Sequence, residues 1–364
     1  MVENKQIIFK SNQELMVESE KKKYRKVIVK RVFFIIASVV MMFVLVGVAL
    51  AFGSADITFL EAYSAVFARA FPNLFHTSPL ADTVVWTLRL PRILLTIFAG
   101  AVLAMSGCTS QTVLRNPIAT PYTLGVSAGA GLGAALGIIL GTGLGNGDFV
   151  VIGNAFVFSL IPLVVILLLV KRRGASPETM ILAGIAMVYI FNACTTILQY
   201  FAEANAVSAT VFWLVGDLSR AAWYQLPYVL VAFVVGFGVN LWLAWDITAM
   251  QLGDDTAKSL GVEADRTRRV SLVVACLSTA VVVAFTGAIG FVCLVAPHIC
   301  RAFVGQNQRV LIISSALVGS ILLLVADIVA RRFMAPVVLP VGAITAFLGG
   351  PLLLYLLIKR KSNR

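Results

Sequence analysis

The chain has 364 residues, of which 60% are hydrophobic and 13% are charged. Soluble globular domains carry about 45–50% apolar and about 25% charged residues, so this composition excludes an ordinary soluble domain. Apolar stretches of about 17 residues or more, long enough to cross a bilayer, recur along nearly the whole chain. The sequence therefore predicts a single all-α integral membrane domain, not a soluble domain with one anchor.

The formal net charge is +12, which in a soluble protein would suggest nucleic acid as a partner. Here the basic residues gather before Phe33, at 171–173, between 258 and 269, and after Ile358. Lysine and arginine concentrate in this way in the cytoplasmic segments of membrane proteins. We therefore predict a cytoplasmic, or inner, membrane protein that contacts membrane lipid and binds no nucleic acid.

Residues 1–31 are polar and end in a basic run at 21–26. They are predicted to form a cytoplasmic tail that contacts anionic headgroups or stays disordered. The tail is too long for a usual signal peptide, and no small-residue cleavage pattern follows the first apolar segment. That segment is therefore predicted to be a retained helix.

The sequence predicts ten spans. They cover residues 32–52, 83–111, 119–142, 149–170, 179–201, 225–245, 270–288, 290–304, 310–330 and 341–358. The seventh and eighth spans depend on whether Gly287–Gly290 breaks a helix or is a flexible point within one. A break places both termini in the cytoplasm, whereas nine spans would place the basic tail 359–364 outside. We therefore predict a transmembrane domain over 32–358, with a cytoplasmic connector at 246–269.

The outer connectors, 53–82 and 202–224, are predicted to be partly helical and to lie at the membrane interface, where aromatic residues gather. The third span carries small residues at near-helical spacing, which allow close helix approach in lipid. They are Gly125, Gly129, Gly131, Gly133 and Gly137. A tight helix crossing and a path for bulky cargo both fit this stripe.

Reactive side chains are few and scattered. The cysteines show no paired spacing, which is typical of small buried hydrophobes. His298 and His76 have no carboxylates or thiols at metal-ligand spacing, so we predict no metal site. Asp327 lies four residues before Arg331, and either an ion pair or part of a proton relay fits this spacing. No catalytic residue or cofactor site is predicted.

A series of short blocks, in order from residue 85 to the C-terminus, resembles the permeases of iron-siderophore, haem and cobalamin ABC importers. The blocks are Arg89-Leu90-Pro91-Arg92, Ala99-Gly100-Ala101, Ser106-Gly107, Leu114-Arg115-Asn116-Pro117, Leu124-Gly125-Val126-Ser127, Trp213-Leu214-Val215-Gly216, the connector 252–262, Gly287–Val292, Ala296-Pro297-His298-Ile299, Ala326–Arg331 and Leu339-Pro340-Val341-Gly342.

The resemblance implies a type II ABC importer permease with about ten transmembrane helices in each subunit. It further implies a homodimer that works by alternating access, with two ATP-binding-cassette ATPase subunits below and an extracytoplasmic substrate-binding protein above. The chain itself carries no phosphate-binding G-x-x-x-x-G-K-[ST] loop. We therefore expect a transport subunit without an ATPase site of its own.

The same resemblance assigns three groups of site residues. The binding protein is expected to dock at Arg89, Arg92 and Arg331, since a guanidinium group pairs bidentately with a carboxylate of the partner. Snorkelling of these arginines to lipid headgroups is the alternative. The residues expected to couple the permease to the ATPase are Leu252, Gly253, Asp254, Asp255, Ser259, Leu260 and Gly261. The residues expected to form the cytoplasmic gate are Asn116, Pro117, Ile118, Pro177 and Glu178.

The gate residues Pro177 and Glu178 also have a simpler explanation, as residues that favour the start of a helix. Ser176 suits a helix N-cap, Pro177 the first helical position, and Glu178 the positive end of the helix dipole. Some family members carry hydroxyls near positions 177 and 178, which this chain lacks.

Two other function classes fit the residues less well. An ion-coupled secondary transporter would need ionisable residues at mid-membrane, and Asp327 lies close to the membrane edge. A membrane enzyme would need a nucleophile or a metal cluster, for which the sequence gives no signal. An importer permease for a metal chelate is therefore the leading hypothesis.

Overall fold

The computed structural model describes residues 2–52, 57–69, 71–144, 147–174, 176–335 and 337–362, and these residues form helices, turns and loops without strands. The helices at the predicted spans are α1 (Val2–Ala51), η1 (Val84–Arg89) with α4 (Leu90–Val113), α5 (Val126–Leu140), α6 (Asp148–Arg173), α7 (Pro177–Tyr200), α9 (Leu226–Trp242), α12 (Ala264–Thr286), α13 (Val292–Val304), α14 (Gln308–Arg332) and α15 (Val341–Ser362). Shorter helices connect them: α2 (Phe59–Ala68), α3 (Pro79–Thr83), α8 (Ala204–Leu214), η2 (Trp223–Gln225), α10 (Ala244–Met250) and α11 (Asp254–Ser259).

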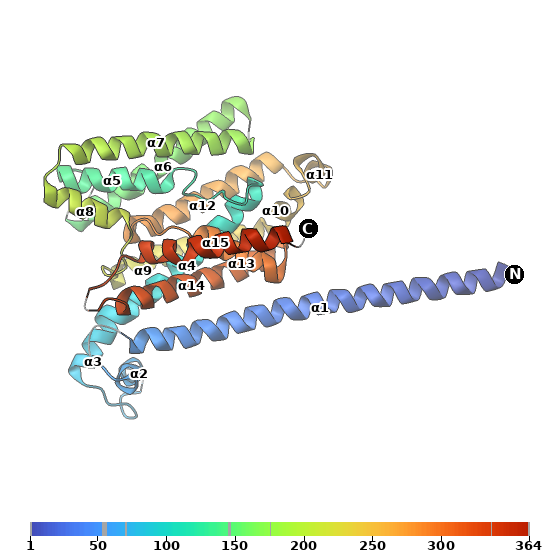
Figure 1. Cartoon of the computed structure of the whole chain (residues 1–364), viewed down its shortest axis with the longest axis horizontal. Coiled ribbons are helices and arrows are strands. Elements are labelled where there is room, and N and C mark those ends of the chain that lie inside the picture. Colours follow the sequence, from blue (N-terminus) through green and yellow to red (C-terminus); the bar gives the residue numbers. More distant parts are fainter. Residues whose placement is uncertain are drawn as a thin grey trace.

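The all-α, polytopic fold class is confirmed. Seven helical stretches in the described residues are long and apolar enough to cross a membrane. The shorter apolar helices α5, α13 and α15 occupy the predicted third, eighth and tenth spans. In Figure 1 both chain ends lie toward the same end of the bundle as α10 and α11, and α2 and α3 lie at the opposite end.

The break between the seventh and eighth spans is a true chain reversal. α12 ends at Thr286 and α13 begins at Val292. Gly287 (φ 69°) and Phe291 (φ 66°) both adopt positive φ, which a continuing α-helix does not allow. A side chain at Gly287 would also collide with the carbonyl oxygen of Trp213. The prediction of a helix break at this point is confirmed.

Two segments differ from expectation. The basic tail is helical and continuous with the first span, because α1 runs without interruption from Val2, and its first half projects beyond the bundle (Figure 1). The third span begins at Val126, later than the predicted start at 119. Residues 114–125 form turns instead, since Gly125 takes a left-handed conformation (φ 95°) that ends them just before α5.

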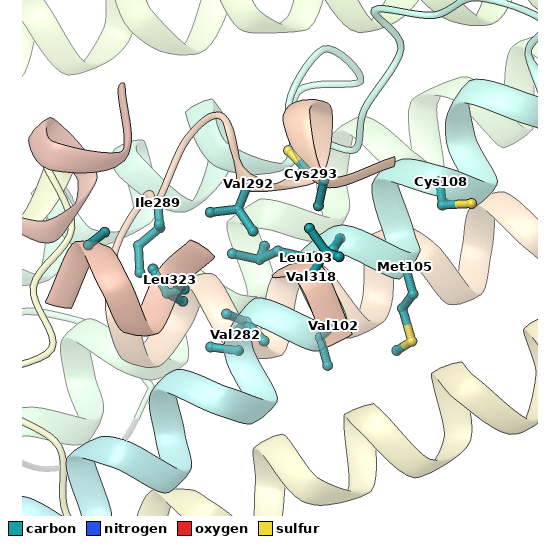
Figure 2. Close-up of a cluster of buried hydrophobic side chains, with 14 of the residues drawn as sticks. Val102, Leu103, Met105, Cys108, Val282, Ile289, Val292, Cys293, Val318 and Leu323 are labelled. Carbon is teal, nitrogen blue, oxygen red and sulfur yellow. The ribbon is translucent and has the colours of Figure 1, made fainter. Parts of the chain in front are cut away.

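The core gathers around α4, which packs against α9, α12, α13 and α14. Of the 18 residues in the most apolar part of the stretch that contains α4, 83% are buried. Figure 2 shows side chains from these helices converging, among them Leu103, Met105, Val282 and Val318. Close packing of this kind replaces the hydrophobic effect as the main source of helix association in lipid.

Glycines set the closest helix crossings. A Cβ atom on Gly133 of α5 would meet the Asn154 carbonyl of α6, and one on Gly129 would meet that of Phe158. Gly100 of α4 and Gly319 of α14 face each other in the same manner. The tight crossing predicted from the glycine stripe is therefore present, and a role for that stripe in a cargo path stays a prediction.

Candidate functional sites

The connector between α9 and α12 folds into two short helices, α10 and α11. Gly253 (φ 112°) precedes α11 and Gly261 (φ 82°) follows it, and both take conformations that favour glycine. The first helix starts slightly before the predicted connector, and α12 takes up its last residues, 264–269. The two-helix arrangement that the resemblance implies is therefore present.

Two leucine side chains of this connector point into solvent. Leu252 is 68% exposed and Leu260 is 63% exposed, one on each side of α11. Asp255 and Ser259 are exposed on the same short helix. Burying a leucine side chain is worth about 1.5–3 kcal/mol, so an exposed pair beside polar groups offers a partner a specific contact.

Asp254 faces inward and anchors the connector. Its carboxylate oxygens accept hydrogen bonds from Nη2 of Arg268 at 2.8 and 2.9 Å. Arg268 is 1% exposed and also donates from Nε to the Val113 carbonyl of α4, at 3.0 Å. Arg115 adds a second cation 3.4 Å from Asp254. Asp254 is thus occupied inside the chain, unlike its neighbour Asp255.

Arg115 and Arg268 are functional candidates that the sequence reasoning did not single out. Arg268 joins the connector to the C-terminal end of α4, and Arg115 joins it to the turn that carries Asn116. Arg115 holds a positive φ of 48°, which a non-glycine residue rarely adopts. No short-range pattern marks these contacts, because the partners lie far apart in the sequence.

The predicted gate residues occupy two turns. The Asn116 side chain accepts a hydrogen bond from the Ile118 backbone N–H at 3.0 Å, and both Pro117 and Ile118 are exposed. At the start of α7, Ser176 accepts from the Thr179 backbone at 3.2 Å, which confirms the N-cap. Pro177 is buried there and Glu178 is exposed. Gating by these residues stays a prediction.

The three predicted docking arginines meet at the opposite end of the bundle and turn inward. Arg89 is 4% exposed, and Arg92 and Arg331 are each 8% exposed. Arg92 Nε and Nη2 both lie 2.8 Å from Asp327 Oδ1, and Arg331 Nε lies 3.0 Å from Asp327 Oδ2. Asp327 is fully buried, so of the two interpretations of this carboxylate the ion pair is the one present.

The same arginines bind the C-terminal end of α1. Arg89 donates to the Leu50 carbonyl at 2.5 Å, and Arg331 donates to those of Ala49 at 3.3 Å and Phe52 at 3.0 Å. These carbonyls lie at the C-terminal end of α1, where the helix dipole is negative. Arg89 and Arg331 therefore cap α1, and their burial leaves little of either guanidinium accessible to a soluble partner. Docking at these residues stays a prediction.

A buried polar network lies between the connector and the core. Gln308 of α14 accepts from Thr112 of α4 at 3.2 Å, and its backbone N–H donates to Thr248 of α10 at 3.4 Å. Gln111 of α4 accepts a hydrogen bond from Arg301 of α13. A movement of α10 is thereby linked to α4, α13 and α14 through hydrogen bonds as well as packing.

No other chemistry emerges from the described residues. They contain no group of three or more metal-ligating side chains. The His298 ring makes a 2.9 Å hydrogen bond from Nδ1 to the Leu294 carbonyl. Four of the cysteines are buried among helices, and Cys194 is partly buried.

Comparison with known proteins agrees with this architecture. The FecCD transport family matches residues 36–359. A protein of Methanocaldococcus jannaschii, described provisionally as an ABC transporter permease, is 41% identical over 93% of this chain and 97% of its own length. The cobalamin import system permease of Halobacterium salinarum is 39% identical, over 81% of this chain and 78% of its own.

A third relative is the Fe(3+)-citrate import system permease YfmE of Bacillus subtilis, which is 33% identical over 78% of this chain and 85% of that protein. Among solved structures, one described provisionally as a metal-chelate type ABC transporter in an inward-facing conformation superposes with a TM-score of 0.79. It is 27% identical and is matched over 89% of this chain and 98% of that one.

Proposed function

Because this chain belongs to the FecCD transport family of ABC importer permeases, we propose that it moves a metal chelate across the cytoplasmic membrane by alternating access. Iron-siderophores, haem and cobalamin are the candidate cargoes. Relatives named as permeases for cobalamin and for Fe(3+)-citrate support this class of cargo. Two copies of the chain would form the path, and both termini would lie in the cytoplasm.

The observation that carries the proposal is the construction of the α10–α11 connector. It presents Leu252 and Leu260 to solvent, while Asp254 and Arg268 fix it to α4 and α12. A connector that exposes apolar side chains and is bonded to the spanning helices can transmit the movement of a bound partner to them. We propose that an ATP-binding-cassette ATPase binds here and supplies the energy, since the chain has no phosphate-binding loop.

We also propose that the substrate-binding protein docks at the outer end of the bundle. The cluster there places the guanidinium groups of Arg92 and Arg331 against one carboxylate, with Arg89 on the end of α1, so positive charge is in excess and would attract an acidic partner. The test is binding of the cognate protein to the permease in nanodiscs, comparing wild type with Arg331→Gln. A folded variant that binds as tightly as wild type would contradict this role.

The transport proposal is tested in proteoliposomes that contain the permease, the ATPase subunits and the binding protein of its own system. We expect ATP-dependent uptake of at least one of ferric hydroxamate, ferric citrate, haem and cobalamin. Omitting the ATPase should abolish that uptake. Uptake driven by an ion gradient in the absence of the ATPase would instead establish a secondary transporter.

A further inference from the structure

A groove of about 670 Å³ opens between three spanning helices. α6 contributes Ile152 and Phe156, α9 contributes Tyr228, and α12 contributes Val281 and Phe285. In the described residues α6 and α9 each pack against α12 but make no comparable contact with each other. The groove therefore runs between α6 and α9 with α12 as its floor. It lies at the start of α6 and α9 and at the end of α12, which is the end of the bundle remote from the connector.

The groove is apolar and opens away from the bundle. Among the side chains that line it, the Tyr228 hydroxyl is the one polar group. Tyr228 is 56% exposed and Phe149 is 48% exposed, so the described part of the chain does not cover the two walls. An empty groove would forfeit dispersion contacts, and a water molecule in it would have too few polar partners. The apolar molecule that surrounds a membrane protein is lipid, and a hydrocarbon chain fits such a groove.

Aromatic side chains mark the mouth of the groove. The rings of Phe149 at the start of α6 and Tyr224 just before α9 lie 5.5 Å apart. Tyr224 and the neighbouring Trp223 are each 43% exposed. Tyrosine and tryptophan gather where a membrane meets water, at the level of the lipid headgroups. A lipid whose chain entered the groove would therefore have its headgroup beside this aromatic pair.

Two exposed charged residues flank the same pair. The Arg220 carbonyl accepts a hydrogen bond from Gln225 Nε2 at 3.1 Å, and that nitrogen also donates to the Tyr224 hydroxyl at 3.2 Å. Asp148 directly precedes Phe149. Both charged side chains are exposed, and neither forms an ion pair within the described part of the chain. A cation and an anion are thus available to a ligand at the mouth.

The other arginines at this end of the bundle have partners in the chain. They are Arg69 with Asp82, Arg89 with the Leu50 carbonyl, Arg92 and Arg331 with Asp327, and Arg332 over the Phe52 ring. Arg220 differs from them in having no such partner among the described residues. Phosphate is a fitting partner for it, since a guanidinium group binds phosphate oxygens bidentately.

We propose that the groove binds one hydrocarbon chain of a zwitterionic phospholipid, with the phosphate on Arg220 and the ammonium group on Asp148. A headgroup that carries both charges complements the two side chains, whereas an anionic lipid without an ammonium group is repelled by Asp148. The bound chain fills the space between α6 and α9 and stabilises their packing on α12. This site does not depend on the transport proposal.

The first test measures occupancy of the groove. The full-length permease is titrated with dioleoyl-phosphatidylethanolamine, and bound lipid is counted by native mass spectrometry. Val281→Trp and Ile152→Trp fill the groove from the floor and from one wall, so each should weaken the tightest lipid site about tenfold. Val234→Trp is the control, because Val234 is 58% exposed on α9 and does not line the groove, and it should bind as wild type does.

Thermal unfolding shows which tryptophan variants are folded. A folded groove variant that keeps wild-type affinity for the lipid would overturn the site. If such a variant instead kept the lipid and changed from dimers to single copies, the groove would be a contact between copies.

The second test measures headgroup recognition and uses exposed residues, whose substitution leaves the fold nearly unchanged. Arg220→Gln should weaken binding of phosphatidylethanolamine and of phosphatidylglycerol, each about threefold to tenfold. Asp148→Asn should weaken binding of phosphatidylethanolamine alone. Arg332→Gln, an exposed arginine at the same end of the bundle, should change neither. Wild-type affinity in Arg220→Gln, or equal binding of the two lipids by the unmodified permease, would overturn the headgroup assignment.

Discussion

The two ends of the bundle carry charged motifs that look alike in the sequence and have opposite surroundings in the structure. At the connector end, Leu252 and Leu260 are exposed while the charged pair of Asp254 and Arg268 is tied inward. At the opposite end, Arg89, Arg92 and Arg331 are almost wholly buried around Asp327 and the end of α1. The connector end thus exposes apolar side chains to a partner, whereas the arginine side chains at the opposite end are buried.

This difference shows that a charged residue in a family motif can stabilise the fold through contacts within the chain, whether or not it also binds a partner. Buried ion pairs contribute little net stability, but removing one member leaves an uncompensated charge and costs much more. The outer cluster should therefore respond to substitution as a folding element. The exposed leucines should respond as a binding surface. Substitutions at the two ends should separate these two behaviours.

The largest effect is expected for Asp327→Asn. The substitution leaves Arg92 and Arg331 buried without a counter-charge, which costs about 3–5 kcal/mol. Thermal unfolding in nanodiscs should show a clearly lower Tm. The matched control is Asp82→Asn, whose partner Arg69 is 54% exposed, and it should cost less than about 1 kcal/mol. Equal Tm values for the two variants would show that the outer cluster is not a folding element.

A smaller effect is expected for Asp254→Asn. It weakens charge-assisted hydrogen bonds to the buried Arg268, which are worth about 1.5–3 kcal/mol, and should speed amide hydrogen exchange in α11. The neighbouring Asp255→Asn changes an exposed side chain and should stay within about 0.5 kcal/mol of wild type. Indistinguishable exchange in the two variants would mean that Asp254 does not anchor the connector.

Leu252→Ser and Leu260→Ser should leave stability nearly unchanged and weaken ATPase binding. Each removes an exposed apolar side chain that the partner would bury, so a loss of about tenfold or more in affinity is expected for each. Co-purification and titration with the ATPase measure it. Leu60→Ser, on the 77% exposed Leu60 of α2, is the control. Wild-type affinity in both connector variants would move the ATPase contact elsewhere.

The smallest effect concerns salt. Raising ionic strength from about 0.1 M to about 1 M shortens the Debye length from about 10 Å to about 3 Å. The Tm difference between wild type and Asp82→Asn should then vanish, because the Arg69–Asp82 pair is exposed. The difference caused by Asp327→Asn should persist, because that cluster is screened little. Parallel salt dependence in the two variants would contradict the contrast between exposed and buried pairs.

The sequence by itself determined the membrane class, the approximate positions of the helices at the predicted spans and the position of the connector. Long apolar stretches, basic segments on one side and the turn residues at Gly287 and Gly253 act locally, through transfer of apolar surface to lipid and through backbone sterics. It also determined the Ser176 cap, and it offered the pairing of Asp327 with Arg331 as one of two interpretations, since both features depend on spacings within one helix.

Only the tertiary structure decided which charged residues face a partner. Arg92 reaches Asp327 across 235 residues of sequence, and Arg268 reaches Val113 across 155. Whether a guanidinium is exposed or buried depends on such distant contacts, which leave no periodic signal in the chain.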